Sequence, residues 1–292
     1  MEQDNAFEIK IDFAPGEGDP TRVFKAMSGL VDAISAFDSH MANSFDVLID
    51  ASLVLDSVDP GSIKAKFRDI IAGIPDEQVK EGDWRKVIGV YLIRAKYQLL
   101  KWLDGTTKIS HRDDIRQLEG SLLRAAEETG LKRLPAYNPP QINLLLSVVH
   151  AIKKSLDELQ DDEIATYSHG NQSIQINRDF SITLETIREV LTKEAVTSSC
   201  IQIVKVKKPD YLGQSMWGLQ YDGRSIKARI LDGDWLAKFQ AREVEVRPGD
   251  SLKVLLQEEI SYGYEKEVVD RHYEIKKVEQ VIHPPTQQRI IF

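Results

Sequence analysis

The stretch "KVKKPDYLGQSMWGLQYDGRSIKARI", residues 205–230, has the pattern of a β-hairpin. Its centre is the dipeptide Asp222-Gly223, which is typical of tight turns between two strands. Apolar and polar residues alternate on both sides of this turn, as in a strand with one buried face. The apolar face would comprise Trp217, Leu219 and Tyr221 before the turn, and Ile226, Ala228 and Ile230 after it. We therefore predict two paired strands whose rings and aliphatic side chains mostly fill a core.

The sequence around this hairpin predicts a small C-terminal barrel. From residue 198 onward the pattern is strand-like, with turns at "YDGR", "RPGD" and "SYGYEKE". One short helix, "DGDWLAKFQ", could close the end of a barrel with Trp235, Leu236 and Phe239. About five short strands with one helix suggest a closed sheet of the OB-like or SH3-like type. The segment "TSSC" marks the expected boundary, which gives a barrel domain at 198–292.

Residues 1–197 predict an N-terminal domain of mixed strands and helices. The stretch "FEIKIDF" alternates as a strand, and a helix follows the loop "PGEGDP". Residues 45–71 turn at "DPGS" and predict a β-hairpin, while residues 83–160 predict a bundle of three helices. A second small hairpin and a helix complete the domain. The expected fold class of the whole chain is α+β.

Composition and charge indicate a globular protein without a membrane span or an export signal. The chain has 292 residues, 42% of them hydrophobic, and a net charge of −8. Charges interrupt even the richest apolar run, "VIGVYLIRAKYQLLKWL", so no membrane span is expected. The acidic start "MEQDNAFEIK" does not resemble an export signal, and the single cysteine, Cys200, fits a reducing cytoplasm. Residues 198–292 contain 15 Lys and Arg and 14 Asp and Glu, so the net negative charge of the chain lies in the N-terminal domain.

The sequence contains no complete catalytic or cofactor motif. It has no Gly-x-Ser-x-Gly nucleophile turn and no phosphate-binding glycine-rich loop, and its six histidines have no metal-ligand spacing. We expect neither a cofactor nor a metal, and the enzymatic alternatives stay open. One of them is a metal-dependent nuclease, in which Asp250 and Glu274 would hold Mg²⁺ while Lys276 positions water.

Two groups of basic residues are candidate surfaces. On the predicted barrel they are Lys205, Lys207, Lys208, Arg224, Lys227 and Arg229, together with Tyr211. A basic groove beside aromatic rings is typical of single-strand binders, but such residues also form ordinary solvated strand faces. In the N-terminal hairpin, alternation places a second row on one face, at Lys64, Lys66 and Arg68. This row fits a solvated face or a patch for an anion or a partner.

Three segments resemble a group of known sequences. They are "SVDPGSIKAKFRDII", "VKKPDYLGQSMWGLQYDGRSI" and "REVEVRPGDSLKVLL". Together they are similar to uncharacterised bacterial proteins that are associated with mobile elements and phage-defence neighbourhoods. The resemblance implies a place in a bacterial multi-component system, and it supplies no catalytic residues.

The leading hypothesis from the sequence is a non-enzymatic, cytoplasmic interaction or regulatory protein. It would dock a protein partner or assemble with itself, for example through the apolar tail residues Ile290, Ile291 and Phe292, which could add a strand to a neighbouring sheet. The alternative is nucleic-acid binding by the basic aromatic face of the barrel. A metal-dependent nuclease or another hydrolase with a spatially assembled site is the second alternative.

Overall fold

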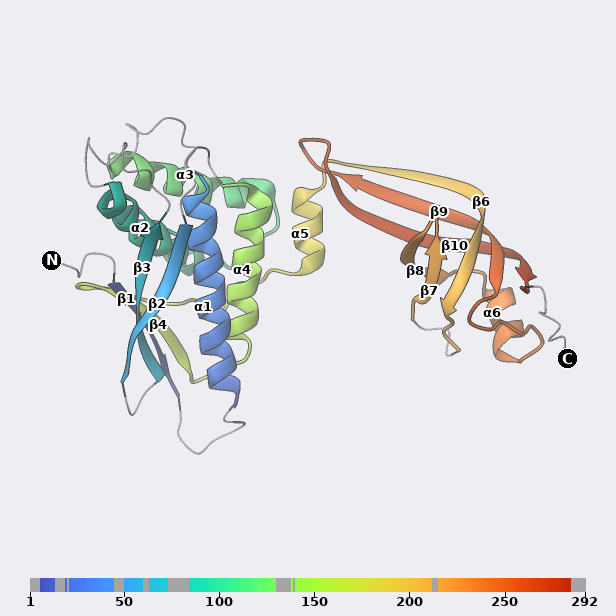
Figure 1. The fold of residues 1–292 in the computed structure, drawn as a ribbon, viewed down its shortest axis with the longest axis horizontal. Helices are drawn as coiled ribbons and strands as arrows, with labels where there is room; N and C mark the ends of the chain where they lie inside the picture. Colours follow the sequence, from blue (N-terminus) through green and yellow to red (C-terminus); the bar gives the residue numbers. More distant parts are fainter. Residues whose placement is uncertain are drawn as a thin grey trace, which may run out of the picture. The chain divides into compact units, whose positions relative to one another are not determined.

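The computed structural model describes residues 6–13, 19, 21–44, 50–59, 63–72, 84–129, 138, 140–211 and 215–284. The chain forms two compact units, Met1–Val190 and Leu191–Phe292 (Figure 1). The division falls slightly before the expected boundary at 197/198. The reason is that "TSSC" is not a linker but part of strand β6, Glu194–Lys208, which runs without interruption through it.

Unit 1 contains a five-stranded antiparallel sheet with the order β2-β3-β1-β4-β5. Its strands are β1 (Ala6–Asp12), β2 (Asp50–Asp59), β3 (Ile63–Ala72), β4 (Ile164–His169) and β5 (Gln172–Gln175). The predicted alternation in β1 is confirmed, because Phe7, Ile9 and Ile11 are buried while Glu8 and Lys10 are not. One face of the sheet therefore belongs to the core.

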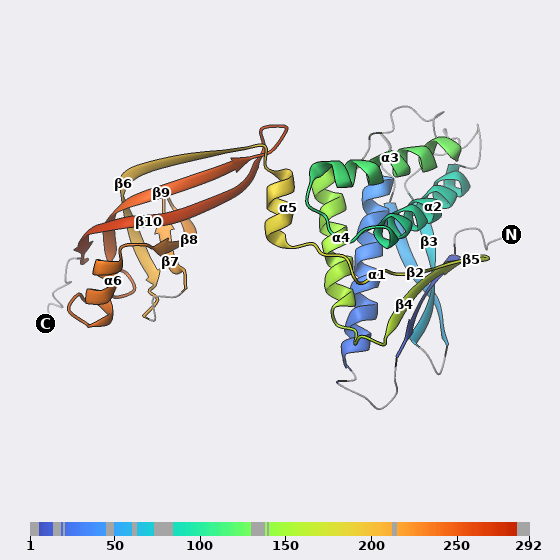
Figure 2. The same cartoon turned by 180° about the vertical axis from the view of Figure 1, so that it is seen from behind.

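Four helices of unit 1 confirm the predicted helical segments. They are α1 (Thr21–Ala42), α2 (Trp84–Asp104), α3 (Arg112–Glu128) and α4 (Ile142–Leu156). Helices α1 and α2 contact the strands of the sheet, and α4 packs beside α1 (Figures 1 and 2). A short fifth helix, α5 (Leu184–Leu191), ends the unit. Among the described helices, none combines the length and apolarity needed to cross a bilayer.

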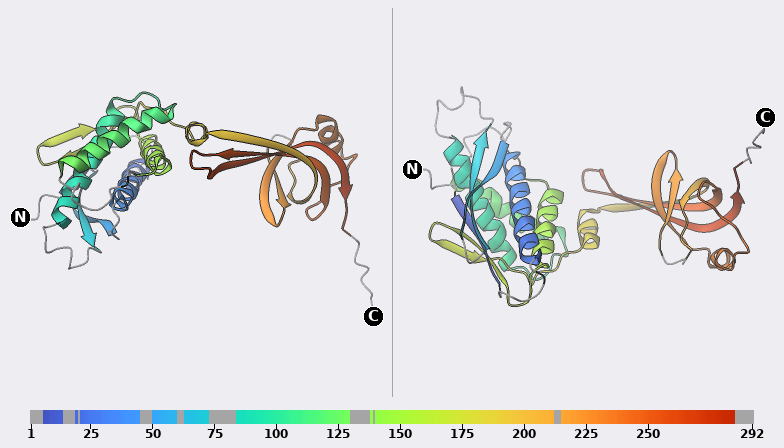
Figure 3. Two further views of the ribbon diagram at one scale, coloured as in Figure 1. Left: turned by 90° about the horizontal axis from the view of Figure 1, so that it is seen from above. Right: turned by 60° about the horizontal axis from the view of Figure 1, so that its bottom comes forward.

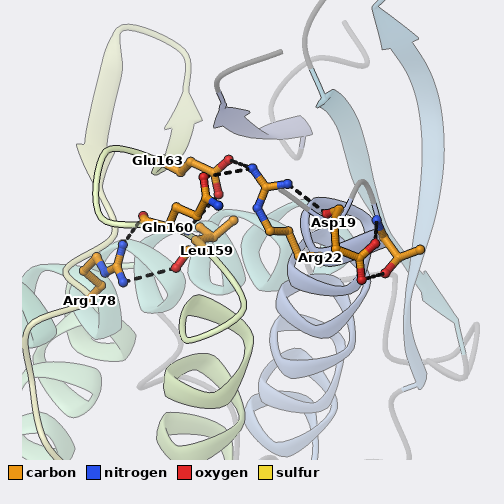
Figure 4. A network of polar contacts seen from close by, with 7 residues as sticks. Asp19, Arg22, Leu159, Gln160, Glu163 and Arg178 are labelled. Carbon is orange, nitrogen blue, oxygen red and sulfur yellow. Dashed lines mark hydrogen bonds and ion pairs between the residues drawn. The ribbon is translucent and has the colours of Figure 1, made fainter. Parts of the chain in front are cut away.

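A polar network joins the start of α1 to the segment between α4 and β4 (Figure 4). The guanidinium of Arg22 donates to the carboxylate of Glu163, the backbone carbonyl of Asp19 and the side chain of Gln160. Arg178 donates to the backbone carbonyls of Leu159 and Gln160. Because Arg22 and Glu163 are both buried, this ion pair fixes the loop rather than presenting charge to a ligand.

Unit 2 is a closed five-stranded barrel with the order β10-β8-β7-β6-β9 (Figure 3). After β6 come β7 (Trp217–Tyr221), β8 (Arg224–Ile230), β9 (Ser251–Tyr262) and β10 (Val268–Ile282). The first strand pairs with the second and the fourth, and the third runs parallel to the fifth. Helix α6 (Gly233–Gln240) connects the third strand to the fourth. This arrangement selects the OB-like alternative over the SH3-like one.

The predicted filling of the barrel is confirmed. Trp217 is 1% exposed and Leu219 is fully buried, and both belong to the core of unit 2. Phe239 of α6 is buried in the same core, with Trp235 and Leu236 packed against it. The carboxylate of Asp232 caps this helix by accepting a hydrogen bond from the backbone N–H of Trp235. The short helix therefore plugs the barrel as expected.

Three strands continue beyond the barrel as a ribbon. Strand β6 pairs with β9 from Glu194 to Lys205, whereas β7 pairs with β6 only between Lys205 and Lys208. Strand β10 accompanies β9 over the same length. Among the described strands, the first two thirds of β6 thus have a sheet neighbour on one side only (Figure 1).

Candidate functional site

The strand register of unit 2 brings most of the predicted basic residues onto one outer surface. Lys205 lies opposite Gln220, and Gln220 lies opposite Ser225. Further along β6, Lys208 lies opposite Gly218 of β7, and Gly218 lies opposite Lys227 of β8. A β-bulge at Lys207 adds a further cation to β6. We define the basic face as the exposed residues Lys205, Lys207, Lys208, Lys227 and Arg229.

The cations of the basic face are not neutralised. Among the described residues, none of the five forms an ion pair, and Lys207 only donates a hydrogen bond to the hydroxyl of Ser225 at 2.7 Å. Other cations of the same unit do have acidic partners, for example Lys253 with Glu279 at 3.1 Å. The parts of unit 2 outside the described residues, 212–214 and 285–292, contain no Asp or Glu in their sequence. Glu274 of β10 lies opposite Arg229 but pairs with Lys276, so the basic face keeps a net positive charge that is centred on its four lysines.

Glycine makes the centre of the basic face flat. Gly218 lies between Lys208 and Lys227 in the register and has no side chain above the sheet. A Cβ added at Gly218 would lie 3.2 Å from the Cβ of Lys208, which is a close contact. A chain laid across this point can approach the backbone of β7 while cations flank it on both sides.

Two members of the predicted barrel surface lie outside the basic face. Arg224 is exposed at the β7–β8 turn, but it shares the side of β8 that carries the buried Ile226 and Ala228. Tyr211 follows the end of β6, and its ring stacks on Phe239 with a centroid distance of 5.2 Å and an interplanar angle of 24°. Tyr211 is nevertheless 62% exposed. The expectation that the rings near the lysines are mostly buried is thus correct for Trp217 and wrong for Tyr211.

The second basic row, on β3 of unit 1, has a different environment. Lys64, Lys66 and Arg68 alternate with the buried Ala65 and Phe67, as expected. However, Lys64 pairs with Glu8 at 3.0 Å and Arg68 pairs with Asp56 at 3.3 Å. This row is a solvated face with compensating acids. The predicted docking residues Ile290, Ile291 and Phe292 lie outside the described residues.

The residues of the nuclease alternative do not converge. Asp250 directly precedes β9, whereas Glu274 lies opposite Gln257, six residues further along β9 than Ser251. At about 3.3 Å per residue, this separation is far longer than a shared metal allows. Glu274 instead pairs with Lys276 at 2.7 Å, and the described residues include no group of three or more potential metal ligands. Cys200, the single cysteine of the sequence, is exposed on β6.

A buried ionic network in unit 1 was not predicted from the sequence. The ammonium of Lys96 on α2 lies 2.7 and 2.8 Å from the two carboxylate oxygens of Asp38 on α1, and 2.8 Å from Asp69 on β3. It also lies 4.8 Å from the centre of the Phe7 ring. Burial raises the pKa of Asp38, and burial together with the charges of Asp38 and Asp69 raises the pKa of Tyr167. Because these side chains are enclosed, the network holds the helices to the sheet and offers no open site.

In comparisons with known proteins, no family model, no curated protein and no solved structure matches the chain. The resemblance to proteins of mobile elements and phage defence therefore stays a prediction.

Proposed function

We propose that unit 2 binds nucleic acid, with the phosphate backbone lying across the basic face. The observation that carries this proposal is the set of five exposed cations on β6 and β8, the two strands that flank β7; none of them forms an ion pair among the described residues. The OB-like topology is compatible with this function, but a fold of this kind serves many functions and does not decide between them.

The physical basis is counter-ion release. Each Lys or Arg that neutralises a phosphate displaces a condensed cation, so binding weakens as salt is added. If all five cations contact a single strand, the slope of log K against log salt concentration is about −3.5. Affinity then falls about 100-fold between 50 and 200 mM salt.

Fluorescence anisotropy of a labelled 12-nucleotide strand, titrated with the full chain at several salt concentrations, tests the proposal. The variant Lys205→Ala/Lys208→Ala/Lys227→Ala removes three of the five cations. Its slope should fall to about −1.4, and its loss of affinity between 50 and 200 mM salt should shrink to about 7-fold.

A second triple variant controls for total charge. Lys193→Ala/Lys253→Ala/Lys266→Ala removes three cations of the same unit outside the basic face, and it should retain the wild-type slope. Equal slopes in the two variants, or no binding by the wild type at 20 mM salt, would refute the proposal.

Docking of a protein remains the second candidate, and one observation favours it. Within the part of the chain that the structure describes, the ribbon part of β6 has a sheet neighbour on one side only, and it exposes Val196, Ile201 and Ile203 by 47%, 54% and 59%. Such an edge can accept a strand from another chain. Light scattering on the full chain and on a chain without residues 284–292 tests self-assembly through the tail. An unchanged complex mass after this deletion argues against the tail as the added strand.

A further inference from the structure

A pocket lies beside Tyr211, at the end of α6. It has a volume of about 690 Å³, and its lining includes the rings of Tyr211 and Phe239 and the side chains of Arg242, Glu245 and Arg247. Its size lies within the range of sites for small organic ligands. Tyr211 is only three residues beyond Lys208, so the pocket adjoins the end of the basic face.

One wall of the pocket is aromatic. The ring of Phe239 stacks with that of Tyr211, at 5.2 Å and 24°, and with that of Trp235, at 5.5 Å and 3°. Trp217 supports Phe239 from the barrel core at 5.0 Å. Since Phe239 is held by buried neighbours and covers one face of Tyr211, the stack presents an anchored aromatic surface at the pocket.

The rim of the pocket supplies cations and hydrogen-bonding groups. Arg247 donates to the carboxylate of Glu245 from Nε at 2.8 Å and from Nη2 at 2.5 Å. Arg242 is exposed and forms no ion pair among the described residues. Its φ of 62° places it in the left-handed conformation that glycine favours after a helix. The end of α6 thus has an unpaired guanidinium at a position where glycine would be less strained.

We propose that this pocket binds one unpaired nucleotide, with the base stacked on Tyr211 and its phosphate at Arg242. This inference rests on the proposed function, because the rest of the strand would cross the basic face. A base within a duplex has both faces covered by its neighbours, so it can reach Tyr211 only after leaving the stack. The pocket therefore selects single strands over duplexes, which the basic face alone does not.

Two substitutions of Tyr211 separate stacking from folding. Tyr211→Ala removes the ring and should lower the affinity for a labelled 12-nucleotide single strand by about 5- to 150-fold. Tyr211→Phe keeps the ring and should bind within about 2-fold of the wild type. A blunt 12-base-pair duplex should bind more weakly than the single strand, and Tyr211→Ala should leave its affinity unchanged.

Arg242→Gly tests the phosphate contact without straining the helix end. Glycine suits the left-handed conformation, so this variant should fold at least as well as the wild type. Its slope of log K against log salt concentration should be smaller by about 0.7, which corresponds to one lost phosphate contact.

The outcomes separate this inference from the proposed function. If Tyr211→Ala binds the single strand as tightly as Tyr211→Phe, the pocket does not stack a base, and the salt-dependent binding of the basic face still stands. Adenosine monophosphate, titrated by calorimetry, probes the pocket alone. If adenosine monophosphate binds in a Tyr211-dependent way but the 12-nucleotide strand binds no more tightly than adenosine monophosphate, the inference about the pocket is correct and the proposed function is wrong. If neither molecule binds at 20 mM salt, both are wrong.

Discussion

Replacing Lys96 with methionine should strongly destabilise unit 1. The side chains of Lys96, Asp38 and Asp69 are each only 1% exposed, and the ammonium of Lys96 contacts both carboxylates. Methionine keeps an unbranched side chain of similar length but leaves two buried carboxylates without a counter-ion. Removal of one partner from a buried ion pair costs about 3–5 kcal/mol. For a unit of this size each kcal/mol lowers Tm by about 2–4 °C, so Tm should fall by about 6–20 °C.

Differential scanning calorimetry of the full chain at pH 7 measures this effect. Lys101→Met is the matched control, because Lys101 lies on the same helix and is exposed. It should change stability by no more than about 0.5 kcal/mol. A Tm for Lys96→Met within 2 °C of this control would refute the reasoning.

A triple variant distinguishes lost charge from lost packing. Lys96→Met combined with Asp38→Asn and Asp69→Asn leaves no buried charge in the network. It should recover much of the lost Tm, since neutral polar groups are less costly to bury than unpaired carboxylates. No recovery would assign the loss to the packing of the lysine stem.

Two further stability predictions follow from buried contacts. Burial raises the pKa of Asp38 in the folded chain above its value in the unfolded chain, which is about 4. The folded state therefore gains stability from the protonated carboxyl below about pH 4, and it loses this stability as pH rises through the folded-state pKa. The Tm of Asp38→Asn relative to wild type should therefore increase between pH 4 and 8; a constant difference contradicts the shift. Gly29→Ala should destabilise the chain, because the added Cβ would lie 2.3 Å from Oγ and 3.1 Å from Cβ of Ser155. An alanine Cβ at Gly120 meets nothing within 4 Å, so Gly120→Ala should stabilise α3 by about 1 kcal/mol. Urea titrations of the two variants measure both changes, and effects of the same sign would argue against close packing of α1 and α4.

The strands of both units can be predicted from the sequence, because the alternation of apolar and polar residues shows which face of a strand is buried. Phe7, Ile9 and Ile11 in β1 and Trp217 and Leu219 in β7 all follow this rule. The unit boundary was placed too late because polar residues in "TSSC" suggest a linker. In the structure these residues occupy the exposed ribbon of β6, where paired backbone groups rather than buried side chains maintain the strand.

The buried network was missed although one signal for it existed. In the sequence, Lys96 is one of the charges that interrupt the apolar run "VIGVYLIRAKYQLLKWL". It lies four residues after Leu92 and three before Leu99, so it shares the buried side of α2 with them. A lysine at such a position needs acidic partners, but these come from α1 and β3, and no local pattern identifies them. The pocket residues Arg242 and Arg247 were missed for the same reason, because they reach Tyr211 only through the fold.

The two basic rows show what a single sequence cannot decide. One row lies on β3 and the other on β6 and β8. In both, lysine or arginine alternates with buried residues, so both fit a solvated face equally well. The difference lies in the neighbouring strands. Those beside β3 supply Glu8 and Asp56, which pair with Lys64 and Arg68. Strand β7, between the basic residues of β6 and β8, supplies Gly218 and Gln220, and Glu274 of β10, which lies opposite Arg229, pairs with Lys276 instead. Because an exposed charge attracts a polyanion only when no closer acid neutralises it, strand register, and not the basic residues alone, favours the barrel over the N-terminal sheet as the binding surface.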